Sequence, residues 1–232
     1  MDLRKAFDTV SHEQLLKSLG YHGLDPAYIT ILQKLYQNQT GAVNGSRRFN
    51  IERGVKQGDV LSAIIFNCVL DVAFENWKVQ LREEGILIHT SVSRLTDTRY
   101  ADDVLLYAKS LEELQEMTEL LVIELQKVGL QLNADKTKIL HSSIYDPGAD
   151  RDYVDINTEF VRVLHGNESH RYLGRLLCLS PSDRIRIELQ NRKNHAWASF
   201  HKHKKVILNS HVSLAKRVQF FDVCVSPSML FA

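Results

Sequence analysis

The sequence predicts an α+β fold, with an antiparallel or mixed sheet that carries helices on one face. Helical segments with capping residues alternate along the 232-residue chain with short apolar segments bounded by turn residues. Hydrophobic residues make up 44% of the chain, which is enough for a core and argues against global disorder. No signal-peptide layout is present at the start, and we expect no apolar run of membrane-spanning length.

Two capping patterns predict the first helices. Ser11 begins a capping box (S-H-E-Q), and we expect its helix to end at Gly20. Pro26 follows an aspartate and predicts a second helix that runs to about Asn38. Turn residues around 42–55 predict a hairpin there.

The middle of the chain predicts a long helix followed by strands. A glycine-punctuated loop over 54–59 leads into an apolar helix from about Leu61 to Arg82. Three apolar segments then predict strands, at 86–91, 94–100 and 104–108.

A second capping box (S-L-E-E) begins at Ser110. Leucines at helical spacing follow it, and Gly129 ends that helix. We expect a turn and a strand over 130–140, a polar loop over 142–152 and a short hairpin over 171–176.

A helical tail begins at Ser180, where the composition changes, and this is the predicted domain boundary. No Asp or Glu occurs from Leu189 to Phe221, although seven Lys and Arg residues lie there. Such a basic stripe is expected where a protein follows a nucleic-acid backbone, and an ordinary solvated helix face is the alternative. Trp197 and Phe200 continue an apolar stripe, so we assign them to packing rather than to base stacking. The residues expected to contact the backbone are Arg192, Lys193, Lys202, Lys204 and Lys205.

Two adjacent aspartates, Asp102 and Asp103, lie at the tip of a predicted hairpin between two apolar runs. Carboxylates so close together resist burial, and a divalent cation such as Mg²⁺, which prefers oxygen ligands, can offset their charge. A solvated turn is the common alternative for an isolated pair. Asp2 lies in a short run that could end a strand. If that strand is a neighbour of the hairpin, three carboxylates converge, which is enough for two ions about 4 Å apart.

Five motifs occur in order along the chain. They are D-L-R-K-A-F-D from Asp2, G-V-K-Q-G from Gly54, Y-A-D-D from Tyr100, the spaced G…N…K-T from Gly129, and Y-L-G from Tyr172. This succession resembles the palm of a reverse transcriptase, most of all that of non-LTR (LINE-type) retrotransposons. The resemblance covers nearly the whole chain. It implies a polymerase palm with motifs A to E over 1–178 and a basic, partial helical thumb over 179–232.

The resemblance also implies a metal site. Asp2, Asp102 and Asp103 would be catalytic and would bind two Mg²⁺ ions, with Mn²⁺ as a substitute, and the carbonyl of Leu3 would be a further ligand. One ion would activate the attacking hydroxyl, and the other would neutralise the triphosphate and its leaving group.

Further residues would bind the substrate. Phe7 would lie under the sugar and collide with a ribose 2′-hydroxyl, which favours deoxynucleotides; a core phenylalanine is the alternative. Gln57 and Gly58 match the loop that lies against the incoming nucleotide and the template, unless they form only a helix-entry turn. Lys136 would help protonate the departing pyrophosphate. Lys138 is a second candidate for this proton donor, and for each of the two an ordinary surface lysine is the alternative.

The implied partners are an RNA template, a DNA primer and deoxynucleoside triphosphates, with no membrane. Tyr172, Leu173 and Gly174 resemble the primer-grip hairpin, which holds the primer 3′ end. Three widely spaced cysteines without a CxxC pair predict a reducing, intracellular location and no zinc site, with nucleus or cytoplasm left open.

Three functions stay open: an RNA-directed DNA polymerase, a related intron-maturase-like reverse transcriptase, and a non-catalytic remnant that only binds nucleic acid. The segment A-F-D-T-V-S-H around Phe7 resembles the LINE-type sequence, and this favours the first function over the second. The family's fingers domain precedes the motif of Asp2. We therefore expect a chain truncated at its N-terminus, with fingers absent, that is weak or inactive as a polymerase by itself.

Overall fold

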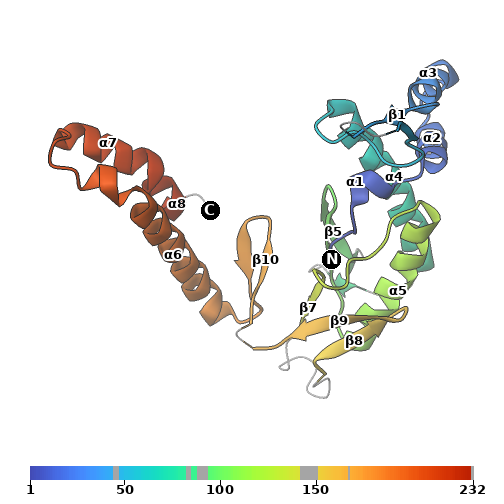
Figure 1. Ribbon diagram of the computed structural model, residues 1–232. Helices are drawn as coiled ribbons and strands as arrows, with labels where there is room; N and C mark the ends of the chain where they lie inside the picture. Colours follow the sequence, from blue (N-terminus) through green and yellow to red (C-terminus); the bar gives the residue numbers. More distant parts are fainter. Residues whose placement is uncertain (44–46, 82–84, 88–93, 142–150, 167, 231–232) are drawn as a thin grey trace. The chain divides into compact units, whose positions relative to one another are not determined.

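The computed structural model describes residues 1–43, 47–81, 85–87, 94–141, 151–166 and 168–230. It is a mixture of helices and strands that divides into two compact units (Figure 1). The first unit comprises residues 1–139 and 148–163, and the second comprises 140–147 and 164–232.

The helices of the first unit begin where local capping residues place them. The Oγ atoms of Ser11 and Ser110 accept hydrogen bonds from the backbone N–H groups three residues later, at 3.5 and 3.1 Å. The predicted end at Gly20 is wrong, because that helix continues to Tyr21 and the chain turns at Gly23, which has a φ of 78°. The helices are α1 (Ala6–Thr9), α2 (His12–Tyr21), α3 (Pro26–Tyr36), α4 (Val60–Gln80) and α5 (Leu111–Lys127).

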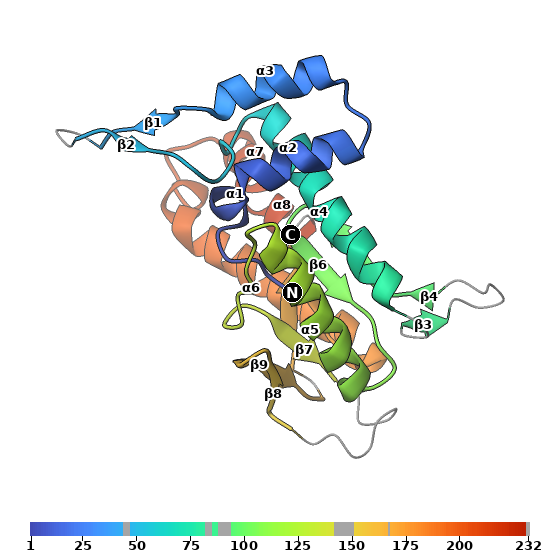
Figure 2. The ribbon, with the colours of Figure 1, turned by 90° about the vertical axis from the view of Figure 1, so that its right-hand side faces the viewer.

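Helix α4 forms the centre of the core. It contacts α2 and α5 (Figure 2), and Phe66, Phe74 and Trp77 on it are almost completely buried. The Trp77 Nε1–H donates to the Met117 carbonyl on α5 at 2.8 Å, which satisfies both groups inside the core. Among the described helices, α4 alone is long and apolar enough to span a membrane, contrary to our expectation that no such run exists. Helix α4 has buried side chains, and a helix in the core of a protein satisfies the same criteria of length and hydropathy as a membrane-spanning helix.

The strands of the first unit form small sheets rather than one continuous sheet, because most contain only two to four residues. The pairings of known register are antiparallel. The pairs are β1 (Thr40–Gly41) with β2 (Phe49–Asn50), β3 (Ile86–Leu87) with β4 (Arg94–Leu95), and β5 (Asp97–Tyr100) with β6 (Asp103–Leu106). A three-stranded sheet has the order β7 (Lys138–Leu140), β9 (Glu159–Leu164), β8 (Tyr153–Ile156).

Hairpin β8–β9 was not predicted. Val154 and Ile156 alternate with exposed residues, and they pack with Val161 and Val163 in a second apolar cluster. That period-2 alternation is the pattern from which the hairpin could have been predicted. The predicted loop over 142–152 lies mostly outside the described residues.

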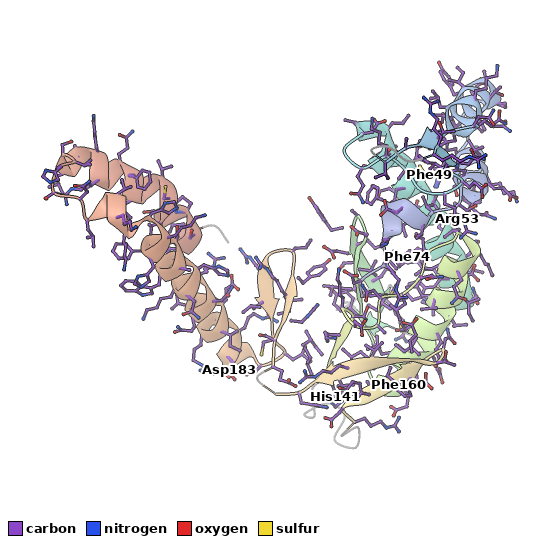
Figure 3. The ribbon with its side chains drawn as sticks, viewed as in Figure 1. Phe49, Arg53, Phe74, His141, Phe160 and Asp183 are labelled. Carbon is purple, nitrogen blue, oxygen red and sulfur yellow. The ribbon has the colours of Figure 1, made fainter. Side chains whose placement is uncertain are left out.

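The second unit contains the predicted short hairpin and the helical tail. Its elements are β10 (His170–Tyr172), β11 (Arg175–Leu177), α6 (Pro181–Ile207), α7 (Leu214–Cys224) and α8 (Ser226–Leu230). Helix α6 contacts α7, α8 and β11, and its first turn carries Asp183 (Figure 3). Hairpin β10–β11 therefore belongs to the same compact unit as α6, and the palm–thumb boundary at 178 stays a prediction.

Candidate active site

The predicted hairpin tip with its two aspartates is present. Strands β5 and β6 are joined by Ala101 and Asp102, and Tyr100 lies opposite Asp103. Ala101 has a φ of 52°, a backbone conformation that glycine adopts more easily than alanine. The tip is therefore a two-residue turn with Asp102 inside it and Asp103 at the start of β6.

The first residues of the chain lie beside β6. The Met1 α-ammonium donates to the Val104 carbonyl at 2.7 Å, and the Val104 N–H donates to the Met1 carbonyl at 3.3 Å. Such a reciprocal pair is the hydrogen-bonded pair of an antiparallel ladder, so the next residues, Asp2 and Asp103, lie opposite each other. Opposite residues point to the same face. The fold thus brings Asp2 and Asp103 together from positions about a hundred residues apart.

Two residues that the sequence reasoning missed hold Asp2 in place. The Asn133 Nδ2 donates to the Asp2 carboxylate at 3.0 Å, and the Asp2 N–H donates to the Thr137 hydroxyl at 3.0 Å. The Asn133 N–H also donates to the Asp2 carbonyl at 3.0 Å. Both residues lie in the fourth motif, but nothing local in the sequence indicates that they contact Asp2.

The backbone carbonyl of Leu3, a predicted metal ligand, lies on the side of the strand that faces the hairpin. It forms an antiparallel bridge with Leu132, in which the hydrogen bonds are made by its neighbours Asp2 and Arg4. Because backbone groups alternate in direction along an extended chain, the Leu3 carbonyl faces the other side, where the hairpin lies. The role of that carbonyl as a metal ligand stays a prediction.

The donor chemistry around Asp2 and Asp103 fits a cation. Burial lowers the pKa of the Met1 α-ammonium, and the Asp103 and Asp2 carboxylates oppose that shift by attraction. Their oxygen atoms are the ligands that Mg²⁺ prefers. Across the residues that the structure describes, however, no three His, Cys, Asp or Glu side chains form a group that could hold a metal ion. Convergence of all three aspartates on a metal stays a prediction.

The loop before α4 is attached to the segment of Phe7. The Val55 N–H donates to the Phe7 carbonyl at 2.6 Å, and the Gly54 N–H donates to the Val10 carbonyl at 2.8 Å. Gly54 has a φ of 87°, and a Cβ there would lie only 2.7 Å from the Asp8 carbonyl oxygen, so this position needs glycine.

Phe7, Gln57 and Gly58 differ in their surroundings. The ring of Phe7 stacks on buried Phe66 with centroids 4.5 Å apart, yet it stays partly exposed. Phe7 therefore packs in the core with one part of its ring, and another part is accessible to a ligand such as the sugar of a nucleotide. Gln57 and Gly58 are exposed, and a Cβ at Gly58 would meet nothing within 4 Å, although its φ of 90° favours glycine. The loop therefore leaves room for a ligand next to its backbone.

The two rival lysines have different environments. Lys136 is exposed on the turn after Asn133, whereas the Lys138 ammonium donates to the Asp135 carbonyl. This contact favours Lys136 as the proton donor, a role that stays a prediction.

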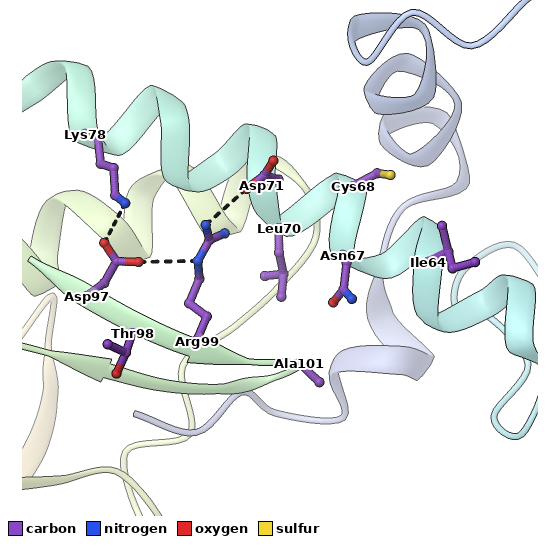
Figure 4. A pocket seen from close by; sticks show the side chains of 10 residues that line it. All are labelled: Ile64, Asn67, Cys68, Leu70, Asp71, Lys78, Asp97, Thr98, Arg99 and Ala101. Carbon is purple, nitrogen blue, oxygen red and sulfur yellow. Dashed lines mark hydrogen bonds and ion pairs between the residues drawn. The ribbon is translucent and has the colours of Figure 1, made fainter.

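A groove of about 680 Å³ between α4 and β5 lies beside the tip (Figure 4). In it, the Asp97 carboxylate, only 3% exposed, pairs with Lys78 at 2.8 Å and Arg99 at 3.3 Å. Arg99 also pairs with Asp71 at 3.1 Å, and its guanidinium lies 4.5 Å from the centre of the Phe74 ring. These contacts attach β5 to α4 and thereby hold the strand that leads to Asp102 and Asp103.

The second unit contains the remaining predicted residues. Leu173 and Gly174, with φ values of 47° and 81°, form the two-residue loop after Tyr172, as a type I′ hairpin requires. Arg192 is less available for phosphate than predicted, because its guanidinium bonds Glu188 at 2.8 Å and the Leu230 carbonyl at 2.9 Å. The other four basic residues, Lys193, Lys202, Lys204 and Lys205, are exposed.

Comparison with known proteins gives consistent matches. Residues 1–177 match the sequence profile of the family described as reverse transcriptase (RNA-dependent DNA polymerase). The Pol polyprotein of the R2DM retrotransposable element of Drosophila melanogaster is 33% identical over 140 residues, which is 59% of this chain and 13% of that protein. An R2 Pol polyprotein of Popillia japonica is 28% identical over 181 residues, 75% of this chain and 29% of its own length. A Xenopus laevis Transposon TX1 protein is 25% identical over the whole chain and 18% of its own length. The chain thus spans less than a third of each of these relatives.

Proposed function

The chain belongs to the reverse transcriptase (RNA-dependent DNA polymerase) family, and we propose that it forms the catalytic palm and part of the thumb of a non-LTR retrotransposon enzyme. By family it is an RNA-directed DNA polymerase. The observation that carries the assignment to chemistry is the register that puts Asp2 opposite Asp103 at the hairpin tip.

In this proposal Asp2, Asp102, Asp103 and the Leu3 carbonyl would hold two Mg²⁺ ions. Bound ions would lower the pKa of the primer 3′-hydroxyl and neutralise charge on the triphosphate. Asn133 orients the Asp2 carboxylate through its amide, so that the site is formed before substrate binds.

Other residues of the chain act on the substrate. Phe7 excludes a ribose 2′-hydroxyl by its ring, which rests on Phe66. Gln57 and Gly58 present an open loop to the nucleotide and the template base, and Lys136 gives a proton to the departing pyrophosphate. Tyr172, Leu173 and Gly174 form the primer grip. The exposed lysines of α6 bind the backbone of the RNA template and DNA primer.

We propose an intracellular location, in the nucleus or the cytoplasm, on the grounds that Cys68, Cys178 and Cys224 are free thiols. No membrane partner is proposed, because the apolar helix α4 contacts α2 and α5 and buries Phe66, Phe74 and Trp77 in the core.

Primer extension on an RNA template tests the proposed chemistry, in a longer retrotransposon polypeptide that contains residues 1–232. We expect Asp102→Ala to abolish Mg²⁺-dependent extension, because the two-metal site loses a ligand. The matched control is Asp183→Ala, at the start of α6, where the carboxylate bonds Ser180 and Arg186. Asp183→Ala should leave extension largely intact, and equal losses in the two variants would exclude the metal assignment.

A non-catalytic protein that only binds nucleic acid is the second candidate. It is favoured by the finding that no metal-holding group of three side chains forms in the described part of the chain. Extension by the longer polypeptide distinguishes the two: Mg²⁺-dependent synthesis that Asp102→Ala abolishes supports the polymerase, and RNA binding without synthesis supports the second candidate. From the 232-residue chain alone we expect weak extension or none, and robust extension would contradict that expectation.

A further inference from the structure

Within the described part of its unit, helix α6 packs against α7 through the side that carries Ser199 and His203. On that side the Ser199 hydroxyl donates to the Cys224 carbonyl at 2.6 Å, and the His203 ring lies 5.5 Å from that of Phe220. Trp197 and His201 lie two residues before and after Ser199. Two residues turn a helix by about 200°, so both side chains point nearly opposite to Ser199 and away from the packed side.

The outer side of α6 therefore carries an exposed aromatic pair. The Trp197 side chain is 54% exposed, and its ring stacks on the exposed His201 ring with centroids 5.9 Å apart and planes 29° apart. The Phe200 ring contacts Trp197 in a perpendicular arrangement, with centroids 5.7 Å apart. The expectation that Trp197 is a packing residue is thus wrong within the described part of this unit, since its side chain stays 54% exposed there.

Basic side chains flank this pair. Lys193 and Lys204 lie four residues before and seven residues after Trp197, on the same face, and Lys205 lies four residues after His201. All three are exposed, and no carboxylate occurs between residues 189 and 221 to neutralise them. A flat aromatic surface between cations complements a ligand that combines planar rings with phosphates.

We propose that the Trp197–His201 pair, flanked by Lys193 and Lys204, is a stacking platform for unpaired bases of the RNA template. Every base has a face that stacks on an aromatic ring, so the platform accepts any sequence, while the lysines contact the phosphates. The choice of an RNA template rests on the proposed function. A peptide ligand is a weaker explanation of this surface, because it carries no row of phosphates for the lysines to contact. Packing within the unit is a weaker explanation as well, because it would bury Trp197, which is 54% exposed.

Tryptophan fluorescence tests the platform in the full 232-residue chain. The chain has two tryptophans, and Trp77 is 0% exposed, so quenching by a ligand reports on Trp197. We expect a single-stranded RNA of about 12 nucleotides, within the site sizes known for such surfaces, to quench the emission on binding. Trp197→Ala should weaken binding about 10-fold, by anisotropy of a labelled RNA, because base stacking is lost.

Two variants serve as controls. Trp197→Phe keeps an aromatic ring, so it should retain most of the affinity but lose the quenching. Phe160→Ala removes an exposed aromatic of the first unit, on β9 (Figure 3), and should leave the affinity unchanged. Circular dichroism of each variant separates loss of binding from loss of folding.

The outcomes separate the platform from the proposed function. Unchanged RNA affinity in folded Trp197→Ala would overturn the platform, although RNA binding and Asp102-dependent synthesis would stand. Absence of RNA binding by the chain would overturn it as well, and the extension assay would still test the chemistry. Tighter binding of single-stranded DNA of the same sequence would overturn the RNA assignment.

Discussion

At the scale of single residues, the environment of Asp2 depends on residues far away in the sequence. Its carboxylate accepts from Asn133, 131 positions away, and its N–H donates to Thr137. Two carboxylates opposite each other on paired strands repel. The hydrogen bonds to Asp2 therefore matter, because they hold its carboxylate in one orientation despite this repulsion. Asn133 is thus a positioning residue in the proposed mechanism.

We predict that Asn133→Ala lowers kcat for nucleotide addition about 10-fold with little change in the KM for the nucleotide, because Asp2 loses its orientation. The measurement is steady-state extension by the longer polypeptide described above. Asp135→Ala, an exposed change on the same turn, is the matched control and should be neutral. A rise in KM at constant kcat would place Asn133 in substrate binding instead.

At the scale of elements, the contact between hairpin β10–β11 and α6 depends on Glu188. Its carboxylate accepts from the Leu176 N–H at 3.1 Å and from Arg192 at 2.8 Å. The Arg192 hydrogen bond and the Leu176 N–H hold the pKa of Glu188 below its ordinary value. Since Arg192 also reaches the Leu230 carbonyl, one ion pair joins the hairpin, α6 and the end of α8.

The lowered pKa sets the sign of a pH effect. The ionised form is favoured in the folded state, so its contribution is present above the ordinary carboxyl pKa and is lost as the pH falls through the folded pKa. We predict that Glu188→Gln lowers the free energy of unfolding at pH 7 by up to about 1 kcal/mol, a value limited by solvent screening. Urea unfolding at several pH values should show this difference shrinking to near zero in acid. Gln190→Ala, on the exposed side of α6, is the control. A difference that persists unchanged in acid would argue against the ion pair.

At the scale of the whole molecule, the residues of the proposed mechanism are distributed over two compact units. The first contains the aspartates, the loop of Gln57 and the Phe7 stack. The second contains the hairpin of Tyr172 and the basic helix α6, whose outer side carries Trp197. If the proposed function holds, we expect mutations to separate chemistry in the first unit from binding of the nucleic-acid backbone by the second.

We predict that Asp102→Ala leaves the RNA affinity of the 232-residue chain within about 2-fold, because non-contacting sites act additively. The double variant Asp102→Ala with Trp197→Ala should bind RNA as weakly as Trp197→Ala alone. Anisotropy titrations at one fixed salt concentration provide the comparison. A large effect of Asp102→Ala on affinity would show that the two sites are coupled.

Local signals in the sequence determined much of this protein. The caps at Ser11 and Ser110, the apolar run of α4 and the turn at Asp102 predict elements that the structure contains, because each depends on neighbours only a few residues away. The ordered motifs also predicted the family, which the profile match over 1–177 confirms.

Only the tertiary structure decided which residues meet. The bonds between Met1 and Val104 set the register that puts Asp2 opposite Asp103, and Asn133 reaches Asp2 across the fold. The packed side of α6 likewise leaves Trp197 exposed, although its spacing in the sequence is that of a core residue. Contacts and exposure depend on the elements packed against a residue, and helical or strand periodicity cannot specify those neighbours.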